Sequence, residues 1–276
     1  MELGKVGIWS GWGHWTGNRA DAAEVEELGF GSLWLGGSPG GDLKVVEDVL
    51  DATTTLTAAT GIVNIWQDAP ESIAQAYHRI EAKHPGRFLL GIGASHKLFN
   101  DQYEKPYDKL VSYLDALDAA GVPASGRVLA ALGPKVLRLA ADRSAGAHPY
   151  LTTPEHTAFA REVLGPDGLL APEIAVVLEP DRETARAHAR QYLSLYLQLP
   201  NYTNNFKRYG FTDADIADGG SDRLVDALIP FGVDAALAKV AEHHEAGADN
   251  VNIQVAKPDH SIAMDEIRAL GAALAQ

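Results

Sequence analysis

The stretch RFLLGIGASH, residues 87–96, begins as an uninterrupted apolar run and ends in two glycines, a serine and a histidine. Such a run predicts a strand that is buried on both faces, which is typical of parallel sheets. Glycine near the end of a strand lets another backbone or a ligand approach closely. The end of this strand is therefore a candidate position for chemistry.

Further apolar runs recur along the chain, and amphipathic helical patterns separate them. They span residues 5–10, 31–37, 61–66, 127–133, 146–152, 173–179 and 250–256. About eight strand-then-helix units in 276 residues predict one parallel (β/α)₈ barrel, a TIM barrel, over residues 1–276. A doubly wound open sheet is the alternative. However, the first strand-to-helix turn, SGWGHWTGNRA at 10–20, lacks the G-x-G-x-x-G spacing of that fold.

The segment 199–231 lies between the seventh predicted strand and a helix that begins near Asp234. It is longer than an ordinary connection, so we expect an insertion that carries short helices. His243 and His244 lie on the helix that follows, and we expect them to face solvent.

The composition restricts the class of partner. A formal net charge of −14 argues against nucleic acid and anionic membranes, because a polyanion would be repelled. The sequence has no cysteine, which excludes thiolate chemistry and fits a reducing compartment. No apolar stretch is long enough for a membrane span and the start does not resemble a signal peptide, so we expect a cytoplasmic protein.

The residues that follow the predicted strands would form the rim of such a barrel, where its active sites lie. This rim is aromatic and nearly free of carboxylates, so we expect no metal. A cleft lined by tryptophans suits a planar heteroaromatic cofactor, although Trp9 and Trp34 have an alternative interpretation as core residues. The predicted pocket residues are Trp12, His14, Trp15, Trp66, His148 and Tyr150.

The stretch ALGPKVLRLAADRSAG, residues 131–146, runs from a strand into a helix. Gly133 precedes the helix, Pro134 opens it and Lys135 lies in its first turn. Free backbone N–H groups and the helix dipole make such a start an anion site. An ordinary helix start without a ligand is the alternative.

Taken together, several motifs resemble those of the bacterial luciferase-like (β/α)₈ oxidoreductases, in particular the actinobacterial group that uses the deazaflavin coenzyme F420. The resemblance covers almost the whole chain, and the segment at 71–96 is its most specific part. The motifs are GFGSLWLGG at 29–37, TGIVNIW at 60–66, ESIAQAYHRIEAKHPGRFLLGIGASH at 71–96, ALGPKVLRLAADRSAGAHPYLTTPEHT at 131–157 and ADNVNIQV at 248–255.

The resemblance implies roles for individual residues. It assigns the cofactor phosphate to Ala131, Leu132, Gly133 and Pro134, beside Lys135. It assigns a bulge that backs the deazaflavin ring to Val63, Asn64 and Ile65, with a non-proline cis peptide between Val63 and Asn64 in several relatives. Gly91, Gly93 and Ser95 are expected beside the cofactor, and His96 is the leading acid/base candidate.

Gly37 and Ser38 mark a departure from the sugar-phosphate dehydrogenases of that family, which have an acidic residue followed by histidine there. The same substrate is therefore not implied. The resemblance predicts an F420-dependent oxidoreductase acting on a small organic molecule, in a family whose members are commonly homodimers. Two alternatives stay open: an FMN-dependent monooxygenase of the same fold, and a protein that binds F420 with little turnover.

Overall fold

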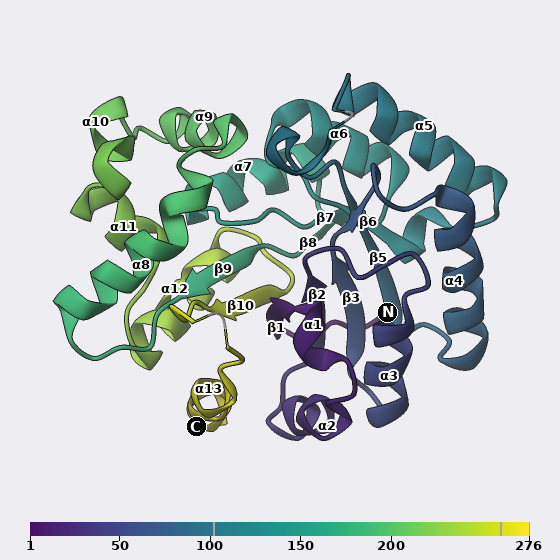
Figure 1. Cartoon of the computed structure of the whole chain (residues 1–276), viewed down its shortest axis with the longest axis horizontal. Helices are drawn as coiled ribbons and strands as arrows, with labels where there is room; N and C mark the ends of the chain where they lie inside the picture. The colour runs from purple at the N-terminus through teal and green to yellow at the C-terminus, as the bar shows by residue number, and fades with distance from the viewer. Residues whose placement is uncertain (102, 260, 276) are drawn as a thin grey trace.

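The structure is a computed structural model, and it describes residues 1–101, 103–259 and 261–275 (Figure 1). Its strands form one parallel sheet. In chain order, the strands are β1 (Val6–Gly11), β2 (Ser32–Gly36), β3 (Thr57–Gly61), β4 (Val63–Asn64), β5 (Phe88–Gly93), β6 (Arg127–Leu129), β7 (Gly146–Ala147), β8 (Leu169–Leu170), β9 (Glu173–Val176) and β10 (Val251–Val255).

The sheet has the order β8-β7-β6-β5-β3-β2-β1-β10-β9, with β4 paired to β5. Strands β8 and β9 are two parts of one segment, interrupted only at residues 171–172. This segment pairs with β7 on one side and with β10 on the other. The Ala171 amide donates to the Ala147 carbonyl, and the Asn252 amide donates to the Pro172 carbonyl. The circle is therefore closed, and the predicted (β/α)₈ barrel is confirmed.

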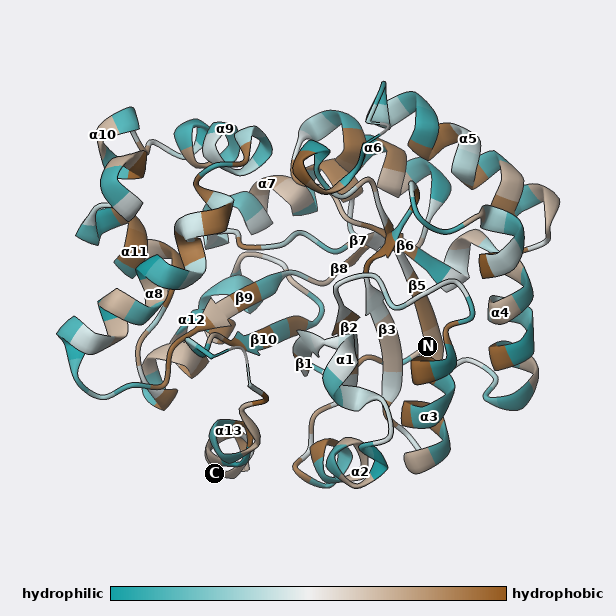
Figure 2. Cartoon of the chain, viewed as in Figure 1, coloured by the Kyte–Doolittle hydropathy of each residue, from teal (hydrophilic) through white to brown (hydrophobic). Residues whose placement is uncertain are grey.

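Helices cover the outside of the barrel. Those that follow the first six strand positions are α1 (Trp12–Trp15), α2 (Arg19–Glu27), α3 (Lys44–Ala52), α4 (Pro70–Lys83), α5 (Pro106–Ala119), α6 (Pro134–Arg143) and α7 (Pro154–Leu164). Figure 2 shows why they pack as they do: β5 is hydrophobic along its length, whereas α4 alternates hydrophobic and hydrophilic bands. The apolar band of α4, with Ile73, Tyr77 and Ile80, is buried against the strands.

A second group of helices lies beside β9 and β10, on the left of Figure 1. It comprises α8 (Arg182–Tyr196), α9 (Pro200–Arg208), α10 (Asp213–Ile216) and α11 (Asp222–Leu228), and α12 (Val233–Glu245) and α13 (Met264–Leu274) complete the chain. The segment 199–231 thus holds α9, α10 and α11. Helices α8, α9 and α11 share an apolar cluster with Leu151 and Val177.

The third strand position differs from the prediction at 61–66. Strand β3 covers the small residues of Thr57–Gly61, and the more apolar IVNI stretch, residues 62–65, forms a bulge that contains the two residues of β4. Packing inside the barrel explains why the small residues form the strand, because Ala59 packs in the lumen beside Trp34 and Leu89. A larger residue than alanine would compete with the Trp34 indole for the same space.

His243 corrects another expectation. Its side chain is fully buried between α12 and α7, and its Nδ1 lies 2.8 Å from the Thr157 hydroxyl. In the part of the chain that the structure describes, no helix is both long and apolar enough to cross a membrane.

Candidate active site

The mouth of the barrel has an aromatic floor. The His148 imidazole stacks on the Trp34 indole inside the lumen, with ring centroids 4.0 Å apart. Above this pair, Trp9 meets Tyr150 edge-on at 5.1 Å. Trp34 is fully buried, so its alternative interpretation as a core residue is confirmed, whereas Trp9 is half-buried and faces the mouth.

Two glycines make room for the Trp9 ring. A Cβ on Gly36 would lie 2.1 Å from the ring, and a Cβ on Gly61 would lie 2.4 Å from its Nε1. Both distances are far below van der Waals contact, so any side chain at either position would displace the indole. The glycines at the ends of β2 and β3 therefore place Trp9 across the floor.

His148 is held as a neutral imidazole. Its Nδ1 donates to the Ala171 carbonyl at 2.6 Å, so the lone pair is on Nε2 in this tautomer. Burial lowers the pKa of His148 to about 4, because the charged form loses its hydration there. Nε2 and the Trp9 Nε1–H are both buried without a partner among the described residues. The floor thus holds an acceptor and a donor that no described side chain satisfies.

The bulge after β3 contains a non-proline cis peptide, but between Gly61 and Ile62. The expectation of a cis bond between Val63 and Asn64 is wrong by two residues. The Asn64 amide donates to the Ser38 Oγ at 3.0 Å, and the Asn64 Nδ2 donates to the Asn100 side chain at 2.9 Å. Because Val63 and Ile65 are at most 2% exposed, their side chains anchor the bulge in the core.

Gly91 and Gly93 have a different role from the one expected. A Cβ on Gly91 would lie 1.8 Å from the Thr60 carbonyl oxygen, and the Thr60 hydroxyl bonds to both the amide and the carbonyl of Gly91. A Cβ on Gly93 would meet the Ile62 side chain at 2.9 Å. The space over Gly91 is filled by β3 and the space over Gly93 by the bulge, so these glycines let the neighbouring chain approach and do not themselves open room for a ligand.

His96 follows β5 and lies under the second group of helices. Its ring centroid is 5.6 Å from that of Tyr202 on α9, and 6.1 Å from that of Phe99. Partial burial lowers the pKa of His96, and the Asn201 side chain opposes this shift through a hydrogen bond. Ser95, just before it, has a left-handed backbone with φ of +52°. His96 is thus a neutral base candidate beneath α9.

The start of α6 has the form of an anion site. Gly133 precedes the helix and Pro134 opens it, as predicted. The Gly133 and Lys135 amides donate to no described residue, and no described atom lies within 4 Å of the position of a Cβ on Gly133. The loop is supported from behind, since His156 Nε2 donates to the Leu132 carbonyl at 2.9 Å. Ala131 is buried in the core and Leu132 packs against the second group of helices.

The Lys135 ammonium points toward the Tyr107 ring and not toward the start of α6. Its Nζ lies 3.5 Å from the centroid of the Tyr107 ring on α5, which is a close cation–π contact. An anion at the start of α6 would therefore meet backbone amides first.

The predicted aromatic pocket divides into two groups. Trp15 is 1% exposed and belongs to the core, and His14 pairs with Asp21 at 3.0 Å on the outer side of α1. Neither lines the mouth. Trp12 is exposed beside Gly37, and the Trp66 Nε1 donates to the Ala94 carbonyl at 2.7 Å near the end of β5. With His148 and Tyr150, these two do lie near strand ends.

A tyrosine cluster was missed by the sequence analysis. The Tyr150 hydroxyl lies 2.8 Å from those of Tyr192 and Tyr196, and it donates to the Gln254 Oε1 at 2.6 Å. Tyr202 packs against Tyr196 at 5.1 Å. Tyr192 and Tyr196 are four residues apart, so they lie on one face of α8, and this part of the cluster could have been predicted from the sequence.

Glu173 was missed as well. It is the first residue of β9, fully buried, and its Oε2 accepts from the Leu151 amide at 2.9 Å. Burial raises the pKa of Glu173 to about 8, because an ionised carboxylate loses its hydration there. Its Oε1 has no partner within the described part of the chain. At neutral pH this buried side chain is thus a protonated carboxylic acid.

Among the described residues, no group of three or more His, Cys, Asp or Glu side chains is placed to hold a metal ion. The structure combines an aromatic floor, a neutral histidine after β5 and a set of backbone amides without a described partner at the start of α6. A cluster of tyrosine hydroxyls from Tyr150 and α8 lies beside them. A planar ring with an anionic side chain matches this combination.

Comparison with solved structures shows the same fold. An F420-dependent secondary alcohol dehydrogenase bound to an F420–acetone adduct has a TM-score of 0.72 at 13% identity, with 98% of each chain covered. The coenzyme F420-dependent tetrahydromethanopterin reductase of Methanopyrus kandleri has a TM-score of 0.70 at 13% identity, over 97% of this chain and 98% of that one.

A third structure carries a different cofactor. The oxygenating constituent of 3,6-diketocamphane monooxygenase from Pseudomonas putida, in complex with FMN, has a TM-score of 0.66 at 13% identity, over 91% of this chain and 92% of that one. No protein with a curated description matches this sequence. The model of the family described as luciferase-like monooxygenase matches residues 5–250. The chain therefore belongs to the luciferase-like monooxygenase family.

Proposed function

We propose that this protein is an oxidoreductase that binds coenzyme F420 at the barrel mouth and moves a hydride between the deazaflavin and a small organic substrate. The observation that carries the proposal is the start of α6, where the Gly133 and Lys135 amides are free and a Cβ-sized space is open. When bound, F420 supplies hydride chemistry at its ring, and the protein supplies binding, orientation and proton transfer.

The character of the anion site favours F420 over FMN. The linking phosphate of F420 is a diester with one negative charge, whereas the phosphate monoester of FMN carries about −1.5 to −2 at pH 7. A helix N-terminus offers roughly half a positive charge. Because Lys135 is engaged with Tyr107, its ammonium adds little to that charge. A site built mainly from amides suits the monoanion better.

Solved structures of the same fold include enzymes of both cofactor classes. The F420-dependent dehydrogenase and reductase superpose with TM-scores of 0.72 and 0.70, above the 0.66 of the FMN complex. All three share 13% identity with this chain, so what they support is the fold.

In this proposal, different residues of the mouth bind the cofactor, exclude water and transfer the proton. The α6 amides hold the phosphate, and the bulge from Ile62 to Asn64 backs the ring. The Tyr202 and Trp9 rings exclude water from the mouth, which strengthens the polar interactions inside it. His96, neutral because of its lowered pKa, would exchange at an imidazole nitrogen the proton that accompanies the hydride.

The test is a fluorescence titration of the purified protein with F420 and, in parallel, with FMN at the same low salt. The proposal expects F420 to bind at least tenfold more tightly than FMN. Tighter binding of FMN would replace the proposal with an FMN-dependent monooxygenase. Tight F420 binding without hydride transfer to any of a panel of ketones and alcohols would favour a binding protein with little turnover.

A further inference from the structure

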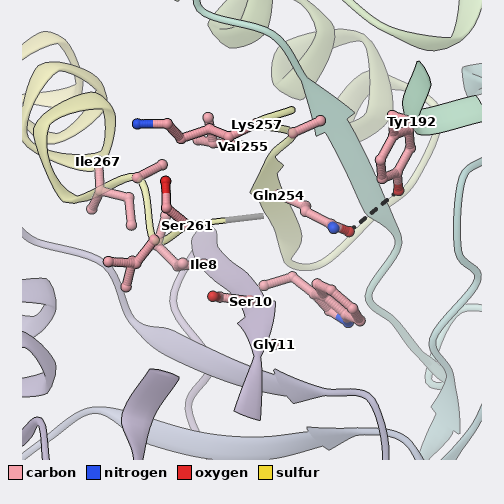
Figure 3. Close-up of a pocket in the computed structure, with 13 residues that line it drawn as sticks. Ile8, Ser10, Gly11, Tyr192, Gln254, Val255, Lys257, Ser261 and Ile267 are labelled. Atoms are coloured by element: carbon pink, nitrogen blue, oxygen red, sulfur yellow. Dashed lines mark hydrogen bonds between the residues drawn. The ribbon is translucent and has the colours of Figure 1, made fainter. Parts of the chain in front are cut away.

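A partly open cavity lies between the carboxyl ends of β1 and β10 and the segment that leads into α13 (Figure 3). It encloses about 190 Å³. Ser10 and Trp9 line it from β1, Gln254 from β10, Tyr192 from α8 and Ile267 from α13. None of the pocket residues predicted from the sequence is among its lining residues, so it is a separate compartment beside the mouth.

Its size excludes the cofactor. A water molecule occupies about 30 Å³ of liquid, so 190 Å³ corresponds to roughly six non-hydrogen atoms. Sites for larger ligands enclose about 300–1,000 Å³. A cavity of about 630 Å³ does exist at the opposite end of the barrel, around Leu3, Leu89 and Ser125. Barrels of this type carry their chemistry at the carboxyl end, so the smaller cavity is the relevant one.

Gln254 gives this cavity its chemical character. The Gln254 Oε1 accepts from the Tyr150 hydroxyl at 2.6 Å and from the Tyr192 hydroxyl at 3.3 Å. Figure 3 shows the Tyr192 bond at the edge of the cavity. With its oxygen engaged twice, the amide keeps its Nε2 donors free, since Nε2 bonds to no described residue. The Ser10 hydroxyl also has no partner in the described part of the chain. The cavity thus presents hydrogen-bond donors to an oxygen atom.

The walls carry no net charge. The Lys257 Nζ lies 3.0 Å from the Glu266 carboxylate, so this cation is already paired. Burial raises the pKa of Tyr192, which keeps its hydroxyl neutral. Ser261 donates to Asp259 at 2.7 Å. A charged guest would lose its hydration and find no free counter-ion, so the cavity suits an uncharged guest.

Trp9 connects the cavity to the mouth. The same indole that lies over Gly36 and Gly61 forms a wall of the cavity. Ile8 and Ile267 supply apolar surface on the other sides. A guest held there lies directly beside the floor of the proposed cofactor site.

We propose that this cavity is the substrate subsite, and that it binds an uncharged ketone, aldehyde or alcohol of about six non-hydrogen atoms, whose oxygen accepts hydrogen bonds from Gln254 Nε2 and Ser10 Oγ. The inference rests on the proposed function. A carbonyl becomes the alcohol by gaining a hydride at carbon, which the cofactor would supply, and a proton at oxygen, which the Ser10 hydroxyl would donate while it regains a proton from the mouth. Both forms therefore present the same oxygen to these donors.

The experiment is ligand-observed saturation-transfer NMR on the full chain with three probes of equal size: cyclopentanone, butyrate and pentylammonium. Cyclopentanone is expected to bind with a Kd on the order of 1 mM, and the two ions at least tenfold more weakly. Gln254→Leu is expected to weaken cyclopentanone binding about tenfold. Gln75→Leu, on the exposed face of α4, is the matched control and is expected to change nothing.

Ser10→Ala is a second variant, because Gln254→Leu also removes the acceptor of two tyrosines and so alters the fold locally. It is expected to weaken cyclopentanone binding about threefold. Equal binding of all three probes, or equal cyclopentanone binding by all variants, would overturn the inference. Loss of F420 binding with cyclopentanone binding intact would instead refute the proposed cofactor and leave this cavity as a site.

Discussion

The His148 imidazole stacks on the Trp34 indole with ring centroids 4.0 Å apart and planes inclined by 18°. This pair fills the lumen beneath Trp9, and together the three rings form the floor on which a planar cofactor would lie. The neutral state of His148 matters here, because an imidazolium would repel other cations and require hydration that the lumen does not offer.

The floor depends on two glycines, which gives a first prediction. Gly36→Ala places a methyl group 2.1 Å from the Trp9 ring, so the indole must move. Overpacking of this kind costs about 1–3 kcal/mol of unfolding free energy. Gly40→Ala is the control, because no described atom lies within 4 Å of its Cβ position. Urea unfolding followed by tryptophan fluorescence compares the two; equal stability of both variants would contradict the packing of Trp9.

The lowered pKa of His96 can be measured directly. Partial burial disfavours the imidazolium, so the NMR titration of His96 should have its midpoint below the ordinary value of about 6.5. Asn201→Ala should lower the midpoint further, since Asn201 favours the charged form. His96→Gln identifies the signal by its loss. A midpoint above 7 would show that His96 is mainly charged at pH 7 and would remove it as a base.

Glu173 provides a prediction on stability and pH. Its folded-state pKa is about 8, above the ordinary value of about 4.3, so the folded protein holds a proton that the unfolded chain releases. Stability from this group is therefore full below pH 4 and is lost as the pH rises toward 8. Glu173→Gln removes this loss and should stabilise the protein at pH 7 by about 3 kcal/mol relative to its effect at pH 4. The test is to measure the free energy of unfolding of the original protein and of Glu173→Gln at pH 4 and at pH 7. If the difference between the two proteins is the same at both pH values, Glu173 ionises normally.

Lys135 tests whether amides or a cation hold the cofactor phosphate. Since its Nζ lies over the Tyr107 ring, Lys135→Met should change F420 affinity by less than about threefold. It should also cost about 0.5–1 kcal/mol of stability through loss of the cation–π contact. A hundredfold loss of F420 affinity would mean that the lysine turns to the phosphate on binding.

The repeating order of elements was predictable, because strands buried on both faces read as apolar runs and the helices between them carry one apolar face. The start of α6 was predictable for a similar reason, since proline and glycine act locally. Where the prediction of the third strand failed, tertiary packing decided. Ala59 fits inside the barrel wall and Ala58 outside it, and the apolar stretch after them forms the bulge.

The site was harder to predict, because it depends on contacts between distant segments. The Tyr150–Gln254 hydrogen bond joins residues 104 positions apart, and no local pattern reports it. Trp15 and His14 looked like rim residues since they follow β1, but the short helix α1 turns one into the core and the other toward Asp21. The sequence marks Gly91 and Gly93 as positions of close approach, but the chain that approaches them is Thr60 of β3 and Ile62 of the bulge.

The most direct test of the central claim, that the α6 amides hold the phosphate of F420, compares two variants of equal charge. Gly133→Glu places a carboxylate where the phosphate would lie, and Ser125→Glu places one at the opposite end of the barrel. The F420 affinity of Gly133→Glu should fall at least a hundredfold, while that of Ser125→Glu should stay within about twofold of the original. Equal F420 affinity of the two variants would contradict the account, because the phosphate would then lie elsewhere.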